Sequence, residues 1–470
     1  MSVDSLIRNL RNIMRQDQGV AGDGQRIEQL GWLLFLKLFD DQERFYELRD
    51  DSYTSPIPEE LRWRNWAADP EGMTGEELME FVNNRLFPGL KNLSGAGTQG
   101  AGAVVRAAFT DAFNYMKSGT TLRRLLNELN RYDFNKTDDR HLLNDFYETL
   151  LRELQSAGDY GEFYTPRALT QFVIEMVDPK LGEVVLDPSC GTGGFLVNAI
   201  EHIREQYVNT AEDEQQLRDC IRGVELKQLP HLLATTNLII HGIEVPEHVL
   251  HDDMLARPLT DYGPRDRVDA IVTNPPFGGV VRDGTDKNFP KDLRSNATED
   301  LFMILFMHLL KDGGRAGIVL PDGTLFGEGA KTRIKQKLLT ECNVHTIVRL
   351  PQGVFNPYAG VNTNLVFFTK GEPTQEVWYY QLPLPEGMKQ YTKNRGITAG
   401  EFEPVCSWWH NRTENEHAWK VSIEQIQERN YNLDFKNPHA GEQAEQMSSE
   451  ELKEKILNTE KEIQSILKSI

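Results

Sequence analysis

Residues 271–279, Ile-Val-Thr-Asn-Pro-Pro-Phe-Gly-Gly, place an amide, two prolines and an aromatic ring directly after a short apolar run. Because two adjacent prolines cannot donate to a sheet ladder, a strand that leads into this stretch must end there. The stiff turn that follows holds the Asn274 amide, the Pro275 carbonyl and the Phe277 ring in fixed places. Two oxygen acceptors and a flat apolar face can therefore meet one planar ligand. A strand-ending turn without a chemical role is the alternative.

A second stretch, residues 184–200 (VVLDPSCGTGGFLVNAI), combines a strand pattern, an Asp-Pro pair, a glycine-rich turn and a helix pattern. Its glycines permit positive φ and a close approach of the backbone to a nucleotide-like ligand at the start of the helix. The spacing is GxGG, which differs from the GxGxxG of nicotinamide-binding folds, and no Lys-Ser/Thr follows as in a P-loop. Glu225 ends the next predicted strand, where a carboxylate can bind both hydroxyls of a ribose. A purely structural turn is the alternative.

The elements that must position these turns form an α/β pattern. From about Ala157, short apolar runs alternate with amphipathic stretches, which predicts a doubly wound, mainly parallel, Rossmann-like sheet. The predicted strands are residues 183–189, 221–227, 248–254, 268–274, 315–321, 344–350 and, as the last one, 363–369. Ligands of such sheets bind outside the carboxyl ends of the strands, where both turns lie.

The remainder of the chain divides into three further segments. Residues 1–156 are predicted to form a helical N-terminal domain, with a long helix over 26–51 and a glycine-rich loop over 93–105. The α/β domain is predicted to span 157–375 and to be followed by an extension over 376–445. Residues 446–470 are predicted to form an amphipathic helix that packs on its own body or on a partner. Its apolar seam consists of Leu452, Ile456, Ile463, Ile466 and Ile470.

Composition limits the possible functions. The chain has 470 residues and a formal net charge of −20, so its overall field opposes DNA, and any grip on nucleic acid requires help from a partner. No apolar run approaches the ~20 residues that cross a bilayer, and the N-terminus does not resemble an export signal. The four cysteines are scattered, so we expect reduced thiols in the cytoplasm and no metal site.

The order of the two motifs, 187–195 followed by 274–277, resembles the S-adenosylmethionine-dependent amino-methyltransferases of DNA. More narrowly, the chain resembles the modification subunit of type I restriction-modification systems. Residues 161–173 (GEFYTPRALTQFV), 33–41 (LLFLKLFDD) and 429–439 (RNYNLDFKNPH) look like that family as well, so the resemblance spans nearly the whole chain.

The resemblance implies that the cofactor is S-adenosyl-L-methionine and that the substrate is an adenine flipped out of double-stranded DNA. It implies a cofactor pocket formed by Glu162, Phe163, Tyr164, Thr165, Pro166, Arg167, Asp187, Ser189, Gly191, Thr192, Gly193 and Glu225. Asp253 matches the acid that contacts the cofactor's adenine, although the family more often has Gly-Asp where this chain has Asp252-Asp253. His251 beside them is expected to pack or to lie at the surface.

The resemblance also gives the 274–277 turn its chemistry. The exocyclic amine of adenine is a poor nucleophile because its lone pair is delocalised into the ring. Acceptance of its two hydrogens by the Asn274 side-chain oxygen and the Pro275 carbonyl would favour a tetrahedral nitrogen and free that lone pair. The base would stack on Phe277. The predicted catalytic residues are Asn274, Pro275, Pro276 and Phe277.

Sequence specificity is expected to reside in another chain, because only about 100 residues follow the last predicted strand and the chain is acidic. The resemblance implies a specificity subunit bound by two modification subunits, and a motor-nuclease subunit. The loop over 279–300 could meet phosphates through Arg282, Lys287, Lys291 and Arg294. Two other readings stay open: methylation of RNA or of a protein glutamine, and a non-enzymatic scaffold that binds the cofactor.

Overall fold

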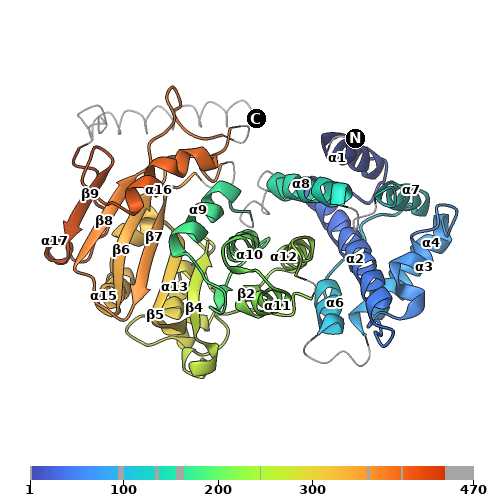
Figure 1. Cartoon of the computed structure of the whole chain (residues 1–470), viewed down its shortest axis with the longest axis horizontal. Helices are drawn as coiled ribbons and strands as arrows, with labels where there is room; N and C mark the ends of the chain where they lie inside the picture. Colours follow the sequence, from blue (N-terminus) through green and yellow to red (C-terminus); the bar gives the residue numbers. More distant parts are fainter. Residues whose placement is uncertain are drawn as a thin grey trace, which may run out of the picture.

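The computed structural model describes residues 3–93, 100–132, 137–154, 164–243, 245–356, 360–392 and 395–439. A helical N-terminal region lies beside an α/β region built on one nine-stranded sheet (Figure 1). The predicted site residues Glu162 and Phe163 and the predicted helix 446–470 lie outside the described residues. Within those residues, no helix is both long enough and apolar enough to cross a membrane.

The N-terminal region is helical, as its apolar periodicity predicts. Its helices are α1 (Val3–Met14), α2 (Asp23–Arg49), η1 (Glu59–Leu61), α3 (Trp63–Trp66), α4 (Gly75–Phe81), the π-helix η2 (Val82–Leu86), α5 (Phe87–Lys91), α6 (Ala101–Phe109), α7 (Gly119–Leu129) and α8 (Thr137–Leu154). The predicted loop over 93–105 is wrong in its second half. Helix α6 begins at Ala101 because Val104 and Val105 are buried in the core of the region, which outweighs the local glycine signal.

The sheet confirms the α/β class. Its strands are β1 (Val185–Asp187), β2 (Ile221–Glu225), β3 (Val249–His251), β4 (Val268–Thr273), β5 (Leu310–Pro321), β6 (Cys342–Arg349), β7 (Thr363–Lys370), β8 (Glu376–Gln381) and β9 (Ala418–Ser422), in the order 3-2-1-4-5-7-6-8-9. Strands β3, β2, β1, β4 and β5 are mutually parallel. Strand β7 lies between β5 and β6 and is antiparallel to both.

In the sequence, helices precede, connect and follow the strands of the sheet. They are α9 (Arg167–Val177), α10 (Gly194–Tyr207), α11 (Ala211–Cys220), α12 (Gln228–Ile240), α13 (Thr298–Leu309), α14 (Asp322–Phe326), α15 (Ala330–Glu341), α16 (Glu403–Trp409) and α17 (Ile423–Glu428). Short 3-10 turns η4 (Leu259–Asp261), η5 (Pro264–Asp266), η6 (Thr285–Asn288) and η7 (Ala399–Phe402) occur in the connections.

The strand order reverses at β1. This strand pairs in parallel with β2 on one side and with β4 on the other, with Val185 opposite both Ile221 and Ala270. The chain runs outward from β1 to β3 and then returns to β4. The loops after β1 and β4 therefore leave in opposite directions and open a crevice at the carboxyl edge of the sheet.

The prediction that residues 363–369 form the last strand is wrong. Strand β8 pairs in parallel with β6, and β9 pairs antiparallel with β8. The rings of Tyr379 on β8 and Trp419 on β9 stack with their centroids 5.4 Å apart. Residues 376–422 therefore continue the same sheet, although their Pro-, Trp- and charge-rich composition hides two strands that lie far apart in the sequence.

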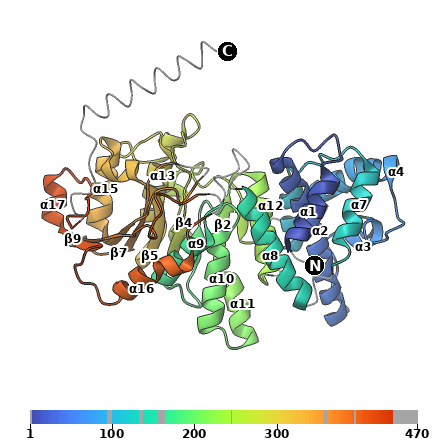
Figure 2. The same cartoon turned by 90° about the horizontal axis from the view of Figure 1, so that it is seen from above.

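The helical region rests on α12, which follows β2 (Figures 1 and 2). Leu229, Leu232 and Leu233 of α12 belong to the hydrophobic core of the helical region. The buried Tyr147 hydroxyl donates to the Leu233 carbonyl at 2.8 Å, and Gln228 Nε2 donates to two carbonyls at the end of α6 at 2.8 and 3.0 Å. The two regions thus share one apolar core through α12, a helix that begins three residues after Glu225.

Candidate active site at the carboxyl edge of the sheet

The crevice at the strand-order reversal contains a cavity of about 360 Å³. The turns after β1, β2, β3 and β4 all contribute to its wall. Among its lining residues are Ser189, Gly191, Glu225, Asp253, Asn274 and Pro276. The tertiary structure thus brings the glycine turn, the strand-end acids and the Asn-Pro-Pro turn to one cavity.

The glycine turn has the backbone conformation that its sequence predicts. Gly191 and Gly193 have φ values of 54° and 80°, and α10 begins at Gly194. A Cβ atom at Gly193 would lie 3.2 Å from Leu238 Cδ1 and 3.4 Å from Ala234 Cα, both on α12. Glycine is therefore required there for its positive φ and for the close packing of α12 against the turn.

Glu225 is fixed by the backbone around it. Its Oε2 accepts a hydrogen bond from Gly191 N at 2.9 Å, and its Oε1 accepts one from Lys227 N at 2.7 Å. The side chain is buried and still lines the cavity. A carboxylate oxygen can accept more than one hydrogen bond, so these two backbone contacts do not by themselves prevent Glu225 from accepting from a pair of ligand hydroxyls. Asn237 of α12 fixes the same turn by donating to the Thr192 carbonyl at 3.0 Å.

Asp187 ends β1 and is almost completely buried. Its Oδ1 accepts hydrogen bonds from Thr273 Oγ1 at 2.6 Å and from Ser189 N at 3.2 Å. Burial raises the pKa of Asp187 to about 7, because these two hydrogen bonds offset only part of the lost solvation, and the charge of Glu225 raises it further. Asp187 is therefore a carboxyl whose charge can change near neutral pH.

The acids after β3 lie at the mouth of the cavity. Asp252 is exposed and Asp253 is half-buried, and both line the cavity. Asp253 Oδ1 accepts from Leu255 N at 3.0 Å, which holds its side chain against the turn. His251 packs away from this chemistry: its Nε2 donates to the Leu226 carbonyl at 3.0 Å, and its ring stacks on His231.

Asn274 lies at the end of β4 with its two amide atoms in different environments. Its Nδ2 donates to Thr165 Oγ1 at 3.0 Å. Its Oδ1 is buried and has no hydrogen-bond partner among the residues that the structure describes. A buried acceptor without a partner costs free energy in a folded protein, so one at a cavity wall indicates a place for a ligand's donor. Pro275 is buried, and Pro276 lines the cavity beside the amide.

Sequence reasoning missed Phe355. This buried ring follows β6 and meets Phe277 edge to face, with centroids 5.8 Å apart and an interplanar angle of 87°. Since β4 and β6 run in the same direction, their carboxyl ends share one edge of the sheet. The available signal was residues 352–355, Gln-Gly-Val-Phe, a glycine turn and an aromatic directly after a predicted strand.

Residues 164–167 connect the site to the helical region. The Tyr164 hydroxyl donates to Glu148 Oε1 of α8 at 2.8 Å, and Arg167 Nε lies 3.4 Å from Glu148 Oε2. Arg167 Nη1 also donates to the Gly194 carbonyl at the start of α10. Burial and the neighbouring charge of Glu148 raise the pKa of Tyr164, so its hydroxyl remains a donor. Nothing in the sequence around Glu148 marked it as part of a site.

The loop over 279–300 is polar and mostly irregular, as predicted. It contains η6, and a single β-bridge joins Val280 to Ala297. Its last three residues are helical, because α13 begins at Thr298. Arg282 is exposed and lines the cavity, and Lys287, Lys291 and Arg294 are exposed as well. Of these four cations, Arg282 is the one that lines the cavity.

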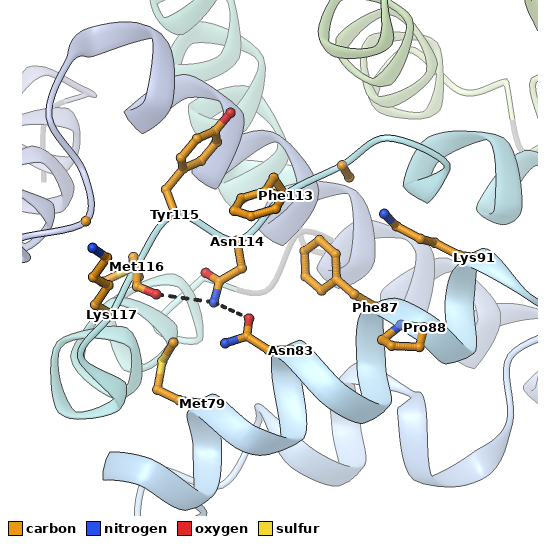
Figure 3. Close-up of a pocket in the computed structure, with 12 residues that line it drawn as sticks. Met79, Asn83, Phe87, Pro88, Lys91, Phe113, Asn114, Tyr115, Met116 and Lys117 are labelled. Atoms are coloured by element: carbon orange, nitrogen blue, oxygen red, sulfur yellow. Dashed lines mark hydrogen bonds between the residues drawn. The ribbon is translucent and has the colours of Figure 1, made fainter.

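A second cavity, of about 690 Å³, lies in the helical region between the α4–η2–α5 stretch and residues 112–117 (Figure 3). Its walls include Phe87 and Phe113, and Asn114 Nδ2 donates to Asn83 Oδ1 at 2.9 Å across it. It contains none of the predicted site residues and no carboxylate. Size alone therefore does not identify the active site; the convergence of polar groups at the strand ends does.

Comparison with known proteins shows the family of the chain. The family model described as "N-6 DNA Methylase" matches residues 138–447, and the one described as "HsdM N-terminal domain" matches residues 3–150. The chain is 55% identical to the EcoEI type I restriction enzyme methylase subunit of Escherichia coli over 94% of this chain and 91% of that protein. It is 30% identical to the EcoKI methylase subunit of E. coli K12 over 83% and 72% of the two chains.

Solved structures agree with these relatives. A protein from Vibrio vulnificus YJ016, assigned as a modification subunit of a type I restriction enzyme, superposes with a TM-score of 0.84 at 42% identity, over 94% of this chain and 98% of that one. A chain from a study of complex assembly and conformational transition in the type I R-M system superposes with a TM-score of 0.85 at 37% identity, over 99% and 96%. This chain therefore belongs to the N-6 DNA methylases and, within them, to the methylase subunits of type I restriction enzymes.

Proposed function

We propose that this chain transfers a methyl group from S-adenosyl-L-methionine to N6 of an adenine flipped out of double-stranded DNA. The observation that carries the proposal is the orientation of Asn274. Its Oδ1 is buried at the cavity wall without a partner, while its Nδ2 is held by Thr165. An acceptor fixed in this way suits one hydrogen of an amino group, and the neighbouring Pro275 carbonyl is the candidate for the other.

The cavity fits the proposed cofactor. Its volume of about 360 Å³ falls within the range of small-molecule sites. Glu225 would hold the two ribose hydroxyls, Asp253 would contact the adenine, and Asp187 would face the cationic part of the molecule. The bound cofactor would supply an electrophilic methyl group on a sulfonium. The contributions of Tyr164, Thr165, Pro166, Arg167, Ser189, Gly191, Thr192 and Gly193 would be to enclose it.

The chain's own part in the reaction would be to orient and polarise the target amine. Hydrogen bonds to the Asn274 oxygen and the Pro275 carbonyl would draw the nitrogen toward tetrahedral geometry. The same two oxygens would stabilise the positive charge that develops on nitrogen as it gains the methyl group. Phe277 and Phe355, packed at right angles, would form the wall on which the flipped base stacks.

DNA would approach the open edge that carries the cavity. Three exposed apolar side chains come from segments next to strand ends at this edge: Val280 after β4, Phe326 at the end of α14 after β5, and Val361 before β7. Val280 belongs to the same 279–300 loop as the exposed cations. Exposed apolar side chains can occupy the space that an extruded base leaves in a duplex. Cations beside them can contact phosphates.

Sequence specificity would come from a separate subunit. The formal net charge of −20 gives this chain little electrostatic attraction of its own for DNA. Within residues 376–422, β8 and β9 belong to the sheet, and Phe402, Val405 and Trp408 between them pack in its core, so this segment does not form a separate target-reading domain. Similarity to the chain from the study of complex assembly in the type I R-M system supports a multisubunit assembly. The assembly that we propose contains two such chains, one specificity subunit and a motor-nuclease subunit. The segment 446–470 is our candidate for docking on the specificity subunit.

Two experiments test the proposed function. Incubation of the complex, co-expressed with the proteins encoded beside it, with radiolabelled S-adenosyl-L-methionine and DNA, RNA or protein should label DNA alone. Label in RNA or in protein glutamine alone would refute the DNA assignment, and cofactor binding without any transfer would favour the scaffold. Mapping of N6-methyladenine in host DNA should then show modification at one recurrent sequence that disappears in the Asn274→Ala strain.

A further inference from the structure

The side-chain amide of Asn274 can present either its oxygen or its NH₂ group to the cavity, and only one of these suits a target amine. A turn of 180° about the terminal bond exchanges the two with almost no change in shape. The Pro-Pro segment fixes the backbone, but it does not decide this rotation. The side chain that contacts the amide, Thr165, accepts a hydrogen bond from Nδ2 at 3.0 Å. That contact leaves Oδ1 as the buried atom without a partner.

We propose that Thr165 is a positioning residue that anchors the Asn274 amide at the cavity wall, and that Glu148 of the helical region holds Thr165 in place. This inference rests on the proposed function and deepens it. Thr165 acts through Asn274, and Glu148 acts through the residues on both sides of Thr165. The helical region then contributes to catalysis at the target amine, although none of its described side chains is among the residues that line the cavity.

Glu148 binds the 164–167 segment at both ends. Oε1 accepts from the buried Tyr164 hydroxyl at 2.8 Å, and Oε2 lies 3.4 Å from Arg167 Nε. Tyr164 precedes Thr165 directly, and Arg167 follows it after one proline, so the two contacts bracket the threonine. A segment held at two points so close together has little freedom to move its central side chain relative to Asn274.

Arg167 also connects the 164–167 segment to α10 of the α/β region. Its Nη1 donates to the Gly194 carbonyl at 3.2 Å, and its Nη2 lies 3.9 Å from Glu201 Oε1 on α10. Pro166 lies between Thr165 and Arg167 and is the N-cap residue of α9, which restricts the backbone there. The path from α8 to the target amine therefore consists of Glu148, the segment 164–167, and Asn274.

The first experiment compares Thr165→Val with Thr165→Ser in the complete methylating complex. Valine keeps the shape of threonine and removes the hydroxyl, so the Asn274 amide becomes free to turn. We expect kcat at saturating cofactor and DNA to fall by about ten- to a hundredfold. The Kd of the cofactor should change by less than about threefold, and Thr165→Ser should recover most of the lost rate because it restores the acceptor.

Thr165 was also predicted to line the cofactor pocket, and the same measurements separate the two roles. If Thr165→Val raises the Kd of the cofactor and leaves kcat at saturation unchanged, threonine serves only the cofactor and the proposal is wrong. An equal loss in Thr165→Ser would also refute it, since the hydroxyl would then not be the active feature. A wild-type complex that methylates no DNA would refute the proposed function and would leave the inference without its basis.

The second experiment tests Glu148 against a matched carboxylate on the same helix. Asp145 lies one turn earlier on α8 and is exposed. We expect Glu148→Ala to lower kcat by about three- to tenfold, whereas Asp145→Ala should leave kcat unchanged. In the double variant, Glu148→Ala should add almost nothing to Thr165→Val, because both act on one amide. The proposed path from Glu148 through Thr165 to Asn274 would be wrong if the losses of kcat in the two single variants were additive in the double variant. It would also be wrong if the loss of kcat in Glu148→Ala followed the fraction of unfolded protein at the assay temperature.

Discussion

Thr273, the last residue of β4, donates a 2.6 Å hydrogen bond to the buried carboxyl of Asp187, the last residue of β1. The contact joins the two strands on either side of the strand-order reversal. It ties the glycine turn, which follows Asp187, to the Asn-Pro-Pro turn, which follows Thr273. Together with the backbone pairing of β1 and β4 and the 2.9 Å contact between Ser189 Oγ and Thr273 Oγ1, this buried hydrogen bond helps to fix the distance between the proposed cofactor and the proposed target amine.

Cofactor affinity should depend on pH through Asp187. Its pKa is raised to about 7, so its charged form, which suits a cationic ligand, becomes populated as pH rises through neutrality. We expect the Kd of S-adenosyl-L-methionine, measured by calorimetry, to fall between about pH 6 and pH 8. Asp187→Asn should bind more weakly and without this pH dependence. An unchanged pH profile in Asp187→Asn would contradict the assignment.

Without ligand, the same group should affect stability in the opposite direction. The pKa of Asp187 in the folded state, about 7, lies above the usual value of 3.8 for an aspartate, so the folded chain binds the proton more tightly. Stability from this carboxyl is present at low pH and is lost as pH rises between those two values, by up to roughly 4 kcal/mol. Thermal unfolding of wild type and Asp187→Asn should therefore diverge as pH rises from 5 to 8, with the wild type losing stability relative to the variant.

Removal of the proposed amine acceptor should separate binding from transfer. Asn274→Ala should lower kcat by about a hundred- to a thousandfold, because a hydrogen bond aimed at developing charge is lost. The cofactor Kd should stay within about threefold of wild type, since the acceptor faces the target amine. Single-turnover methylation and calorimetry measure the two quantities. Full activity in Asn274→Ala would show that the amide oxygen is not the acceptor.

The pair of aromatic rings should matter for the base and not for the cofactor. Phe277→Ala and Phe355→Ala should each weaken capture of the flipped base by about 1–3 kcal/mol. The fluorescence of 2-aminopurine at the target position would report this loss of stacking, and the Kd of the cofactor is the control. Because the two rings touch, the double variant should lose less than the sum of the single losses.

Gly191 offers a test of the glycine turn with a matched control elsewhere. Gly191→Ala and Gly75→Ala both place an alanine at a similar positive φ, 54° and 58° respectively, and should each cost about 1 kcal/mol or more of stability. A Cβ at Gly75 meets no atom within 4 Å. Only Gly191→Ala should weaken cofactor binding, by more than about tenfold. Equal cofactor affinity in both variants would show that the glycine turn does not contribute to cofactor binding.

Local chemistry determined much of this protein from the sequence. The prolines at 275–276 end β4, and positive-φ glycines precede α10. Short apolar runs predict the seven strands between residues 183 and 369, and the structure contains all of them. Each of these signals acts within a few residues of the chain, which is why it can be read without the fold. The charge of −20 was readable as well, because it needs only counting.

Only the tertiary structure decided which side chains meet. Phe355 reaches Phe277 because β7 lies between β5 and β6 and is antiparallel to both, so β6 runs in the same direction as β4. The helical region packs on α12, which places α8 beside residues 164–167. Glu148 of α8 therefore contacts Arg167, in the same segment whose Thr165 contacts Asn274. These contacts depend on strand order and on the packing of separate regions, which are set by the burial of apolar surface across the whole chain and leave no local mark in the sequence.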